Sequence, residues 1–303
     1  MKTKLAFPAL LICLMLLPGA TIQAQKKVAP KKNIAIQLYS VRSLIGGDVT
    51  QADKYKKYTD VLKNLGQMGY TAVEAANYGD GKFYGRTPQE FKKDVEAAGM
   101  RVLSSHCTKA LSAEELASGD FTESLKWWDQ CIAAHKAAGM TYIVTPSLVV
   151  PKTVKDLQTY CDYYNEIGKR CKANGLKYGY HNHSHEYQKV EDKVLMMDYM
   201  IENTKPEYVF YEMDVYWVVM SKNSPVDYFN KYPGRFTVLH IKDHREIGQS
   251  GMVGFDAIFK NAQTAGVKDI VVEVERYSTG VEESVKASLD YLIHESFVPS
   301  TYK

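Results

Sequence analysis

Cysteine is scarce in this chain, and the cysteine spacing argues against two kinds of structure. Five cysteines occur among 303 residues, and no two form a C-x-x-C pair, the usual signature of a thiolate zinc site. Cys161 and Cys171 lie on one predicted helix, about 15 Å apart along its axis, whereas a disulfide needs Cα atoms within about 7 Å. We therefore expect buried, free cysteines.

Nucleotide-binding motifs and a strong charge imbalance are also missing. Neither a G-x-G-x-x-G nor a Walker pattern occurs, so the sequence offers no support for dinucleotide or nucleotide binding. The formal net charge is only +3, and it includes Lys2 and Lys4 at the extreme N-terminus. A chain so close to neutral has no basis for electrostatic steering toward nucleic acid. We therefore expect no nucleic-acid partner.

Long apolar runs are absent except near the N-terminus. There, Lys2 and Lys4 precede the run Leu5–Leu17, and small or polar residues follow it. This pattern is typical of a secretory signal peptide, and the run is shorter than the roughly 20 residues that a membrane span needs. We predict a signal peptide at 1–24, a polar leader at 25–32, and a periplasmic or secreted protein without a stable membrane span. An uncleaved anchor is the alternative.

The rest of the chain alternates short β-rich segments with longer segments of helical spacing. The predicted strands are Asn33–Ser40, Thr71–Asn77, Arg101–His106, Thr141–Ser147, Leu176–His183, Tyr208–Tyr216, Arg235–Asp243 and Asp269–Tyr277. The predicted helices are Ala52–Met68, Pro88–Ala98, Phe121–Ala138, Thr153–Asn174, Leu195–Asn203, Pro225–Tyr232, Phe255–Ala265 and Glu282–His294. Strands that are each followed by a helix predict an α/β fold, a single (β/α)8 TIM barrel over residues 33–303. An open doubly wound sheet is the rival, but it usually has fewer strands and a glycine-rich first turn.

Polar side chains gather at the C-terminal ends of the predicted strands, whose earlier residues are apolar. They are Glu74, Asn77, His106, His181, Asn182, His183, His185, Glu186, Asp214, His240, Lys242, Asp243, His244, Glu273 and Glu275. Because the C-terminal ends of barrel strands form the active-site face of this fold, we expect these groups to converge on one pocket. Any one of these residues is equally well interpreted as a buried residue with hydrogen-bond partners and no function. The same pattern on five strands, however, favours a functional site.

Carboxylates and imidazoles drawn from several strands suit one divalent metal ion. Mixed oxygen and nitrogen ligands are typical of Mn, Zn, Co, Mg or Fe sites, whereas calcium prefers oxygen ligands. An open metal site beside His, Lys and Glu side chains fits proton transfer next to a carbonyl group, with the metal stabilising an enediolate. We therefore predict a sugar or sugar derivative as the small-molecule substrate.

Several short segments together resemble the xylose-isomerase-like TIM barrel superfamily, particularly its sugar phosphate isomerase/epimerase family. They are IQLYSVR at 36–42, AVEAAN at 72–77, SSH at 104–106, YHNHSHEY at 180–187, EMD at 212–214, LHIKDH at 239–244 and VVEVERY at 271–277. Each segment is a weak signal alone, but their order and spacing across residues 33–291 are specific in combination. The resemblance implies a metal-dependent barrel enzyme that acts on sugars.

The resemblance also implies a ligand set. In that family one metal is typically held by an acid ending strand five, an aspartate on strand six, a histidine on strand seven and a glutamate on strand eight. Asp214, His240 and Glu273 match the last three positions. The strand-five position departs from the pattern, because His181 stands where the family usually has glutamate. Either His181 binds the metal, which we favour, or Glu186 folds back from the loop to supply a carboxylate.

Catalytic and substrate-binding roles follow from the same resemblance. The acids of strands eight and five commonly form the proton-transfer pair, which implies Glu273 and Glu186 here. His183 is a further candidate, and Lys242 suits stabilisation of an oxyanion. Family members often place a histidine after the strand-six aspartate, where this chain has Trp217, so a multi-zinc site of the DNA-repair endonuclease kind is not expected. The expected substrate contacts are Glu74, His106, Trp217 and Glu275.

Three functions remain open from the sequence. The first is a metal-dependent sugar isomerase or epimerase. The second is a lyase or dehydratase, in which proton removal next to a ketone is followed by β-elimination, for example from a 3-keto-glycoside. The third is a non-catalytic carbohydrate-binding barrel. A homo-oligomer is compatible with all three.

Overall fold

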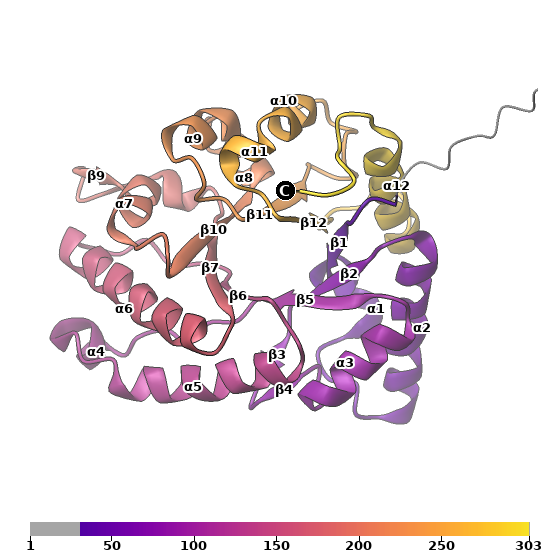
Figure 1. Cartoon of the computed structure of the whole chain (residues 1–303), viewed down its shortest axis with the longest axis horizontal. Helices are drawn as coiled ribbons and strands as arrows, with labels where there is room; N and C mark the ends of the chain where they lie inside the picture. The colour runs from indigo at the N-terminus through magenta and orange to yellow at the C-terminus, as the bar shows by residue number, and fades with distance from the viewer. Residues whose placement is uncertain (1–30, 303) are drawn as a thin grey trace, which may run out of the picture. The chain divides into compact units, whose positions relative to one another are not determined.

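Eight short parallel strands form the centre of the fold (Figure 1). The computed structural model describes residues 31–302, and each strand lies within a predicted strand segment. The strands are β1 Ala35–Gln37, β2 Ala72–Ala75, β5 Arg101–Ser105, β6 Tyr142–Thr145, β7 Lys177–His181, β10 Val209–Asp214, β11 Val238–Lys242 and β12 Asp269–Glu273. The signal peptide at 1–24 and most of the leader at 25–32 lie outside the described residues, so both stay predictions.

The strands are hydrogen-bonded to one another in the order β5-β2-β1-β12-β11-β10-β7-β6. The two end strands also meet. The amide of Thr141 donates to the carbonyl of Leu103 at 2.9 Å, the amide of Cys107 donates to the carbonyl of Val144 at 2.9 Å, and His106 forms a parallel bridge with Val144. The sheet is therefore a nearly closed barrel of parallel strands rather than an open doubly wound sheet.

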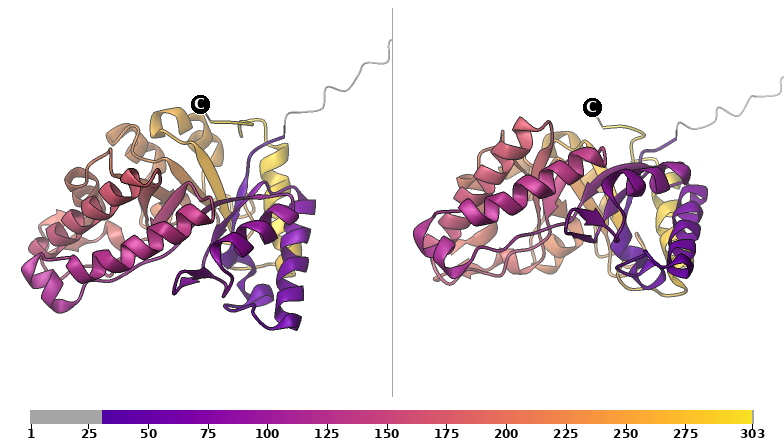
Figure 2. Two further views of the ribbon diagram at one scale, coloured as in Figure 1. Left: turned by 60° about the horizontal axis from the view of Figure 1, so that its bottom comes forward. Right: turned by 90° about the horizontal axis from the view of Figure 1, so that it is seen from below.

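Helices lie around the outside of the barrel, as the views in Figure 1 and Figure 2 show. The main ones are α2 Ala52–Met68, α3 Pro88–Ala97, α5 Thr122–Ala137, α6 Val154–Ala173, α7 Met196–Asn203, α9 Pro225–Lys231, α10 Phe255–Lys260, α11 Ala262–Ala265 and α12 Val281–His294. They match the predicted helices to within one residue at each end, except that the predicted helix Phe255–Ala265 is split at Asn261. No helix in the described part of the chain is both long and apolar enough to cross a membrane.

Short elements that the sequence analysis did not predict follow several strands. They are η1 Leu38–Val41, α1 Arg42–Ile45, the hairpin of β3 Tyr78–Gly79 and β4 Lys82–Phe83, α4 Ala113–Ser118, η2 His185–Tyr187, the hairpin of β8 Lys189–Val190 and β9 Val194–Leu195, and α8 Val215–Met220. The prediction that strand six reaches Tyr216 is therefore wrong. The strand ends at Asp214, because the carboxylate of Asp214 accepts the amide hydrogen of Trp217 and so begins helix α8.

Packing is close both inside the barrel and between the barrel and the helices. A separate apolar cluster of strand residues includes Leu103, Tyr142 and Phe210. Where α6 meets the segment before β10, a Cβ atom on Gly168 would lie 2.2 Å from the carbonyl oxygen of Tyr208, so only glycine allows this approach. The four cysteines of the described chain are free and buried, as expected.

Candidate metal centre

Four side chains from neighbouring strands meet at the C-terminal end of the barrel. His181 ends β7, Asp214 ends β10, His240 lies in the middle of β11 and Glu273 ends β12. The parallel register pairs Asp214 with His240, which places both residues at one level. All four residues are buried, and one potential ligand atom from each lies within 4.8 Å of the others. The barrel thus brings two imidazoles and two carboxylates to one point.

Three atoms of this cluster are buried without a hydrogen-bond partner: Nε2 of His181, Oδ2 of Asp214 and Nδ1 of His240. His181 Nε2 is 3.6 Å from Asp214 Oδ2, and His240 Nδ1 is 3.6 Å from Glu273 Oε2. Unpaired polar atoms in a protein interior are costly, by about 1–3 kcal/mol each. Two nitrogen and two oxygen donors at one point are a ligand set for Zn, Mn, Co or Fe. The residues therefore fit the predicted divalent metal ion.

The other polar atom of each of these three side chains is already occupied. His181 Nδ1 is 3.0 Å from the carbonyl oxygen of Pro146, and Asp214 Oδ1 accepts the Trp217 amide at 3.0 Å. His240 Nε2 is 2.8 Å from a carboxylate oxygen of Glu74. Because carbonyl and carboxylate oxygens only accept, both imidazoles carry their proton on the side away from the cluster. Such partners fix the orientation of the side chains and direct the other nitrogen of each imidazole toward the cluster.

A polar network of Glu74, His106 and Glu212 lies against His240. Glu74 accepts hydrogen bonds from Gln37 at 2.8 Å and from Ser104 at 2.5 Å. His106 Nε2 is 2.8 Å from Glu212 and 3.1 Å from Glu74. Burial disfavours the charged imidazole, but these two carboxylates outweigh that effect and raise the pKa of His106 to about 10. His106 is therefore a cation that neutralises part of the buried negative charge.

Lys242 lies beside Glu273 and is almost fully buried. Its Nζ is 2.8 Å from Glu273 Oε2 and 2.5 Å from Glu275 Oε2, and it lies 5.3 Å from the centre of the Trp217 ring. Burial is the largest single influence and lowers the pKa of Lys242, but Glu273, Asp214 and Glu275 together raise it more, so the net shift is upward. Lys242 in turn holds the pKa of buried Glu273 well below its usual range. Glu273 is thus an ionised carboxylate next to a fixed ammonium group.

A pocket of about 450 Å³ opens above the cluster. Its walls come from different strand ends and from the loops that follow them. The part of the lining next to the cluster consists of Glu273, His181 and His183. Aromatic surface comes from Tyr39 and Tyr78. Among its lining residues there is no lysine and no arginine. Two residues of the cluster, His181 and Glu273, thus line a pocket that is large enough for a small molecule.

Comparison with known proteins agrees with this geometry. A family model described as Xylose isomerase-like TIM barrel matches residues 62–294. The chain belongs to this family. The match covers more than half of the chain, so the resemblance noted in the sequence is confirmed.

The names of similar proteins point to more than one kind of enzyme. A sugar phosphate isomerase/epimerase from Parabacteroides distasonis ATCC 8503 is 34% identical, with 88% of this chain and 100% of that chain covered and a TM-score of 0.78. The inosose dehydratase of Salmonella agona strain SL483 is 23% identical over 208 residues, which are 65% of this chain and 66% of that enzyme, just under two thirds. The structure of the IOLI protein with a bound zinc atom is 13% identical, with 89% of this chain and 99% of that chain covered and a TM-score of 0.65, and it shows a shared fold alone.

In this xylose isomerase-like barrel, the two sequence alternatives for the fourth ligand occupy different places. His181 lies in the cluster with Asp214, whereas Glu186 lies in a separate group with His183 and His185. The turn η2 folds Glu186 inward, where it accepts the hydroxyl of Tyr180 at 2.8 Å and the amide of His183 at 2.8 Å. Both carboxylate oxygens are thus used to fix the loop. The structure places Glu186 outside the cluster, and its predicted role in proton transfer stays a prediction.

The remaining predicted residues divide between the pocket and its surroundings. His106, His183 and Glu275 line the pocket. Burial and the neighbouring His181 lower the pKa of His183 to about 3, so its imidazole is neutral. Trp217 lies with Lys242 in a small adjoining hollow.

Two buried acids stand apart from the residues that line the pocket. Glu74 has no exposed surface and belongs to the network around His240 and His106, and its predicted substrate contact stays a prediction. Sequence reasoning also missed Glu212 as a site residue. Residues two apart on a strand face the same side, so the spacing of Glu212 and Asp214 was the signal for its inward orientation.

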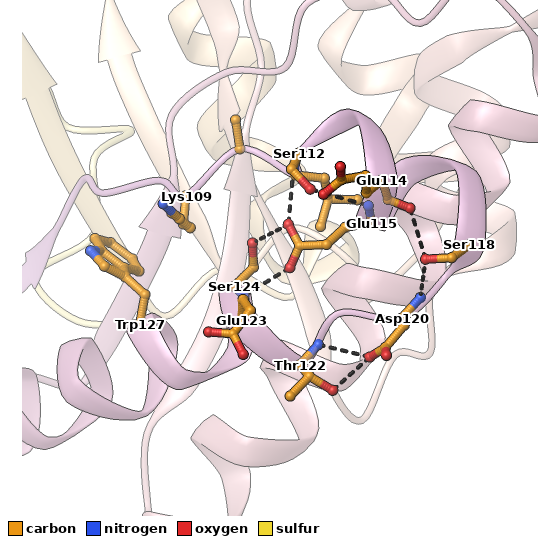
Figure 3. A pocket seen from close by; sticks show the side chains of 12 residues that line it. Lys109, Ser112, Glu114, Glu115, Ser118, Asp120, Thr122, Glu123, Ser124 and Trp127 are labelled. Atoms are coloured by element: carbon orange, nitrogen blue, oxygen red, sulfur yellow. Dashed lines mark hydrogen bonds between the residues drawn. The ribbon is translucent and has the colours of Figure 1, made fainter.

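A larger hollow of about 820 Å³ lies elsewhere, over α4 and the start of α5 (Figure 3). Its walls include Glu114, Glu115, Asp120 and Glu123. Glu115 accepts hydrogen bonds from Ser112 and Ser124 at 2.8–2.9 Å, and so it caps α4 and ties α4 to α5. None of the predicted site residues lines this hollow, and two of its acids, Glu115 and Asp120, form hydrogen bonds at the starts of α4 and α5.

Proposed function

We propose that this protein is a divalent-metal-dependent sugar isomerase or epimerase that moves a proton next to a carbonyl group. One observation carries the proposal: buried, unpartnered atoms of His181, Asp214 and His240 converge with Glu273 beneath an open pocket. A divalent ion at this point would supply positive charge that holds substrate oxygens and stabilises an enediolate.

The side chains of this barrel have distinct tasks in such a reaction. Glu273 is an ionised carboxylate at the pocket, and it accepts the proton from the substrate carbon next to the carbonyl. Lys242, 2.8 Å away, keeps that carboxylate ionised. His183 is neutral, and a neutral imidazole donates a hydrogen bond to a substrate oxygen without changing the net charge of the site.

The charge of the pocket favours an unphosphorylated substrate. The pocket lining contains Glu273, Glu275 and the protonated His106, whose charge Glu74 and Glu212 already offset, but no lysine or arginine. Lys242 lies nearby, but two carboxylates already neutralise it. A phosphate group carries nearly two negative charges and is normally held by arginine, lysine or a helix N-terminus. Tyr39 and Tyr78 provide apolar faces for a neutral sugar ring instead.

A lyase or dehydratase is the second candidate, and the similarity to an inosose dehydratase favours it. The first step is the same removal of a proton beside a carbonyl group. β-Elimination then expels a hydroxyl or an alkoxide from the neighbouring carbon, and isomerisation instead returns a proton. The two reactions therefore share Glu273 and the metal centre, and they differ in the fate of the enediolate.

The experiment that tests this function is an assay of solvent deuterium uptake. Protein incubated with Mn²⁺, Zn²⁺ or Co²⁺ is mixed in D₂O with a panel of unphosphorylated keto-sugars, keto-inositols and 3-keto-glycosides, and the products are followed by NMR. Deuterium at the carbon next to the carbonyl, without loss of a substituent, supports isomerisation or epimerisation. Release of water or of an aglycone supports the lyase. Absence of both over the whole panel, with metal bound, contradicts the proposal.

A further inference from the structure

A second cluster of reactive side chains lies beside the pocket, outside the metal centre. Cys107 follows β5 and Cys131 lies on α5, and their Sγ atoms are 3.4 Å apart. A disulfide bond is about 2.05 Å long, so a small movement of two side chains is enough to join them. Cysteines that lie so close are positioned for oxidation to a disulfide.

His135 lies against both thiols. Its Nδ1 is 2.7 Å from the carbonyl oxygen of Cys131, so Nδ1 carries the proton and Nε2 keeps a free lone pair. This Nε2 is 4.0 Å from Cys107 Sγ. The His135 ring is held between the rings of Tyr78 and Phe83, with centroids 5.0 and 4.9 Å away. The imidazole of His135 therefore lies in contact with both sulfur atoms.

The two cysteines differ in access to solvent. Cys107 is among the residues that line the 450 Å³ pocket, whereas Cys131 has no exposed surface. Burial also raises the pKa of the Cys131 thiol well above its usual value. A small molecule can therefore reach Cys107 first, and Cys131 can only react with a sulfur that is already inside the protein.

We propose that Cys107 and Cys131 are a reversible disulfide site that forms by exchange with a small-molecule disulfide such as oxidised glutathione. The Cys107 thiolate attacks the glutathione disulfide, forms a mixed disulfide and releases one glutathione thiolate. The Cys131 thiolate then attacks Cys107 Sγ and releases the second. Two cysteine thiols are oxidised, one glutathione disulfide is reduced to two thiols, and the two cysteine protons pass to the released thiolates.

The bond would join the pocket wall to a helix. Cys107 directly follows His106, which lines the pocket, and the neighbouring Tyr78 lines it as well. Oxidation would therefore tie the segment after β5 to α5 and fix this side of the pocket. The proposal does not depend on the metal centre or on the proposed reaction.

The test is mass spectrometry of the folded, full-length protein. The protein is incubated with oxidised glutathione, free thiols are alkylated under denaturing conditions, and the protein is digested without reduction. We expect a linked pair of peptides that contains Cys107 and Cys131, which disappears after reduction, and alkylated Cys161 and Cys171. Alkylation of both Cys107 and Cys131 after oxidation, or a stable glutathione adduct on Cys107, would overturn the proposal.

Two variants separate a specific bond from general oxidation. Cys131→Ser should stop the reaction at the mixed disulfide and leave a glutathione adduct on Cys107, whereas the control Cys161→Ser should keep the linked peptide pair. Should Cys131→Ser fail to fold, Cys107→Ser gives the same information, because Cys131 should then stay fully reduced. Formation of glutathione adducts on Cys131 in that variant would contradict the predicted order of attack.

Discussion

At the scale of single residues, the candidate centre depends on which atom of each side chain is already occupied. Pro146 holds one nitrogen of His181, and Glu74 holds one nitrogen of His240. The remaining nitrogens face Asp214 and Glu273. Glu273 belongs to the group of potential metal ligands and also lines the pocket. This makes Glu273 the residue whose chemistry is most informative to change.

Replacement of Glu273 by glutamine should abolish the deuterium exchange of the wild-type protein. The amide keeps the size of the side chain but cannot accept the substrate proton, and general base catalysis contributes roughly 10²–10⁴-fold to a rate. We expect a loss of at least a hundredfold in kcat, measured on whichever substrate exchanges deuterium. Glu123→Gln, on the exposed side of α5, is the matched control and should keep normal turnover. Near-normal kcat in Glu273→Gln would refute the role of this carboxylate.

The sequence predicted individual side chains well where strand geometry controls them. His181, Asp214, His240 and Glu273 lie at or near strand ends, and the closed barrel alone brings strand ends together. The same reasoning does not give the position of Glu186. This residue belongs to a loop, and the path of the loop depends on a turn that no periodic pattern in the sequence indicates. A hydrogen bond from the Tyr180 hydroxyl decides where its carboxylate points.

At the scale of elements, helices and strands were predictable and the connections were not. Helix α3 has a capping box at Thr87 and proline at its first position, and both are visible in the sequence. Helix α8 has no such separate signal in the sequence. Its N-cap is Asp214, and the sequence pattern assigns Asp214 to the sixth predicted strand. The short hairpin β3–β4 shows no local periodicity and is held by packing, since Phe83 contacts Phe91 of α3 and His135 of α5.

Glu246 joins two of these connections, and its protonation should weaken the fold. Its carboxylate accepts the hydroxyls of Ser278 and Ser284 and the amide of Ser278 at 2.6–2.8 Å. Burial alone would raise its pKa, but these hydrogen bonds lower the pKa to about 2. The ordinary pKa is 4.5, so the stabilisation is complete above about pH 4.5 and is lost as the pH falls toward 2.

The corresponding variant is Glu246→Gln, compared with the wild type by urea unfolding at pH 7 and at pH 3. Hydrogen bonds to a charged group are worth roughly 1.5–3 kcal/mol, so we expect a loss of about 2 kcal/mol at pH 7 and a smaller difference at pH 3. The exposed Glu123→Gln serves again as control. An equal difference at both pH values would show that the charge of Glu246 does not contribute.

At the scale of the whole molecule, the interior of the barrel contains several charged side chains that lie next to groups of opposite charge. Glu74 and Glu212 lie below the candidate centre, and the protonated His106 offsets part of their charge. His240 connects the two levels, with Nε2 toward Glu74 and Nδ1 toward the cluster above. A fold that buries carboxylates in this manner must balance them, because isolated buried charges are expensive. A divalent ion in the upper cluster would complete that balance.

The metal content of the purified protein tests the central claim most directly. After incubation with Mn²⁺, Zn²⁺, Co²⁺, Mg²⁺ or Fe²⁺ and removal of free ion, elemental analysis should find about one divalent ion per chain, as expected for a four-ligand site. Asp214→Asn keeps the oxygen that accepts the Trp217 amide and removes the ligand charge, so the folded variant should lose most of this metal. A wild-type protein that retains none of these ions, or an Asp214→Asn variant that retains as much as the wild type, would contradict the account.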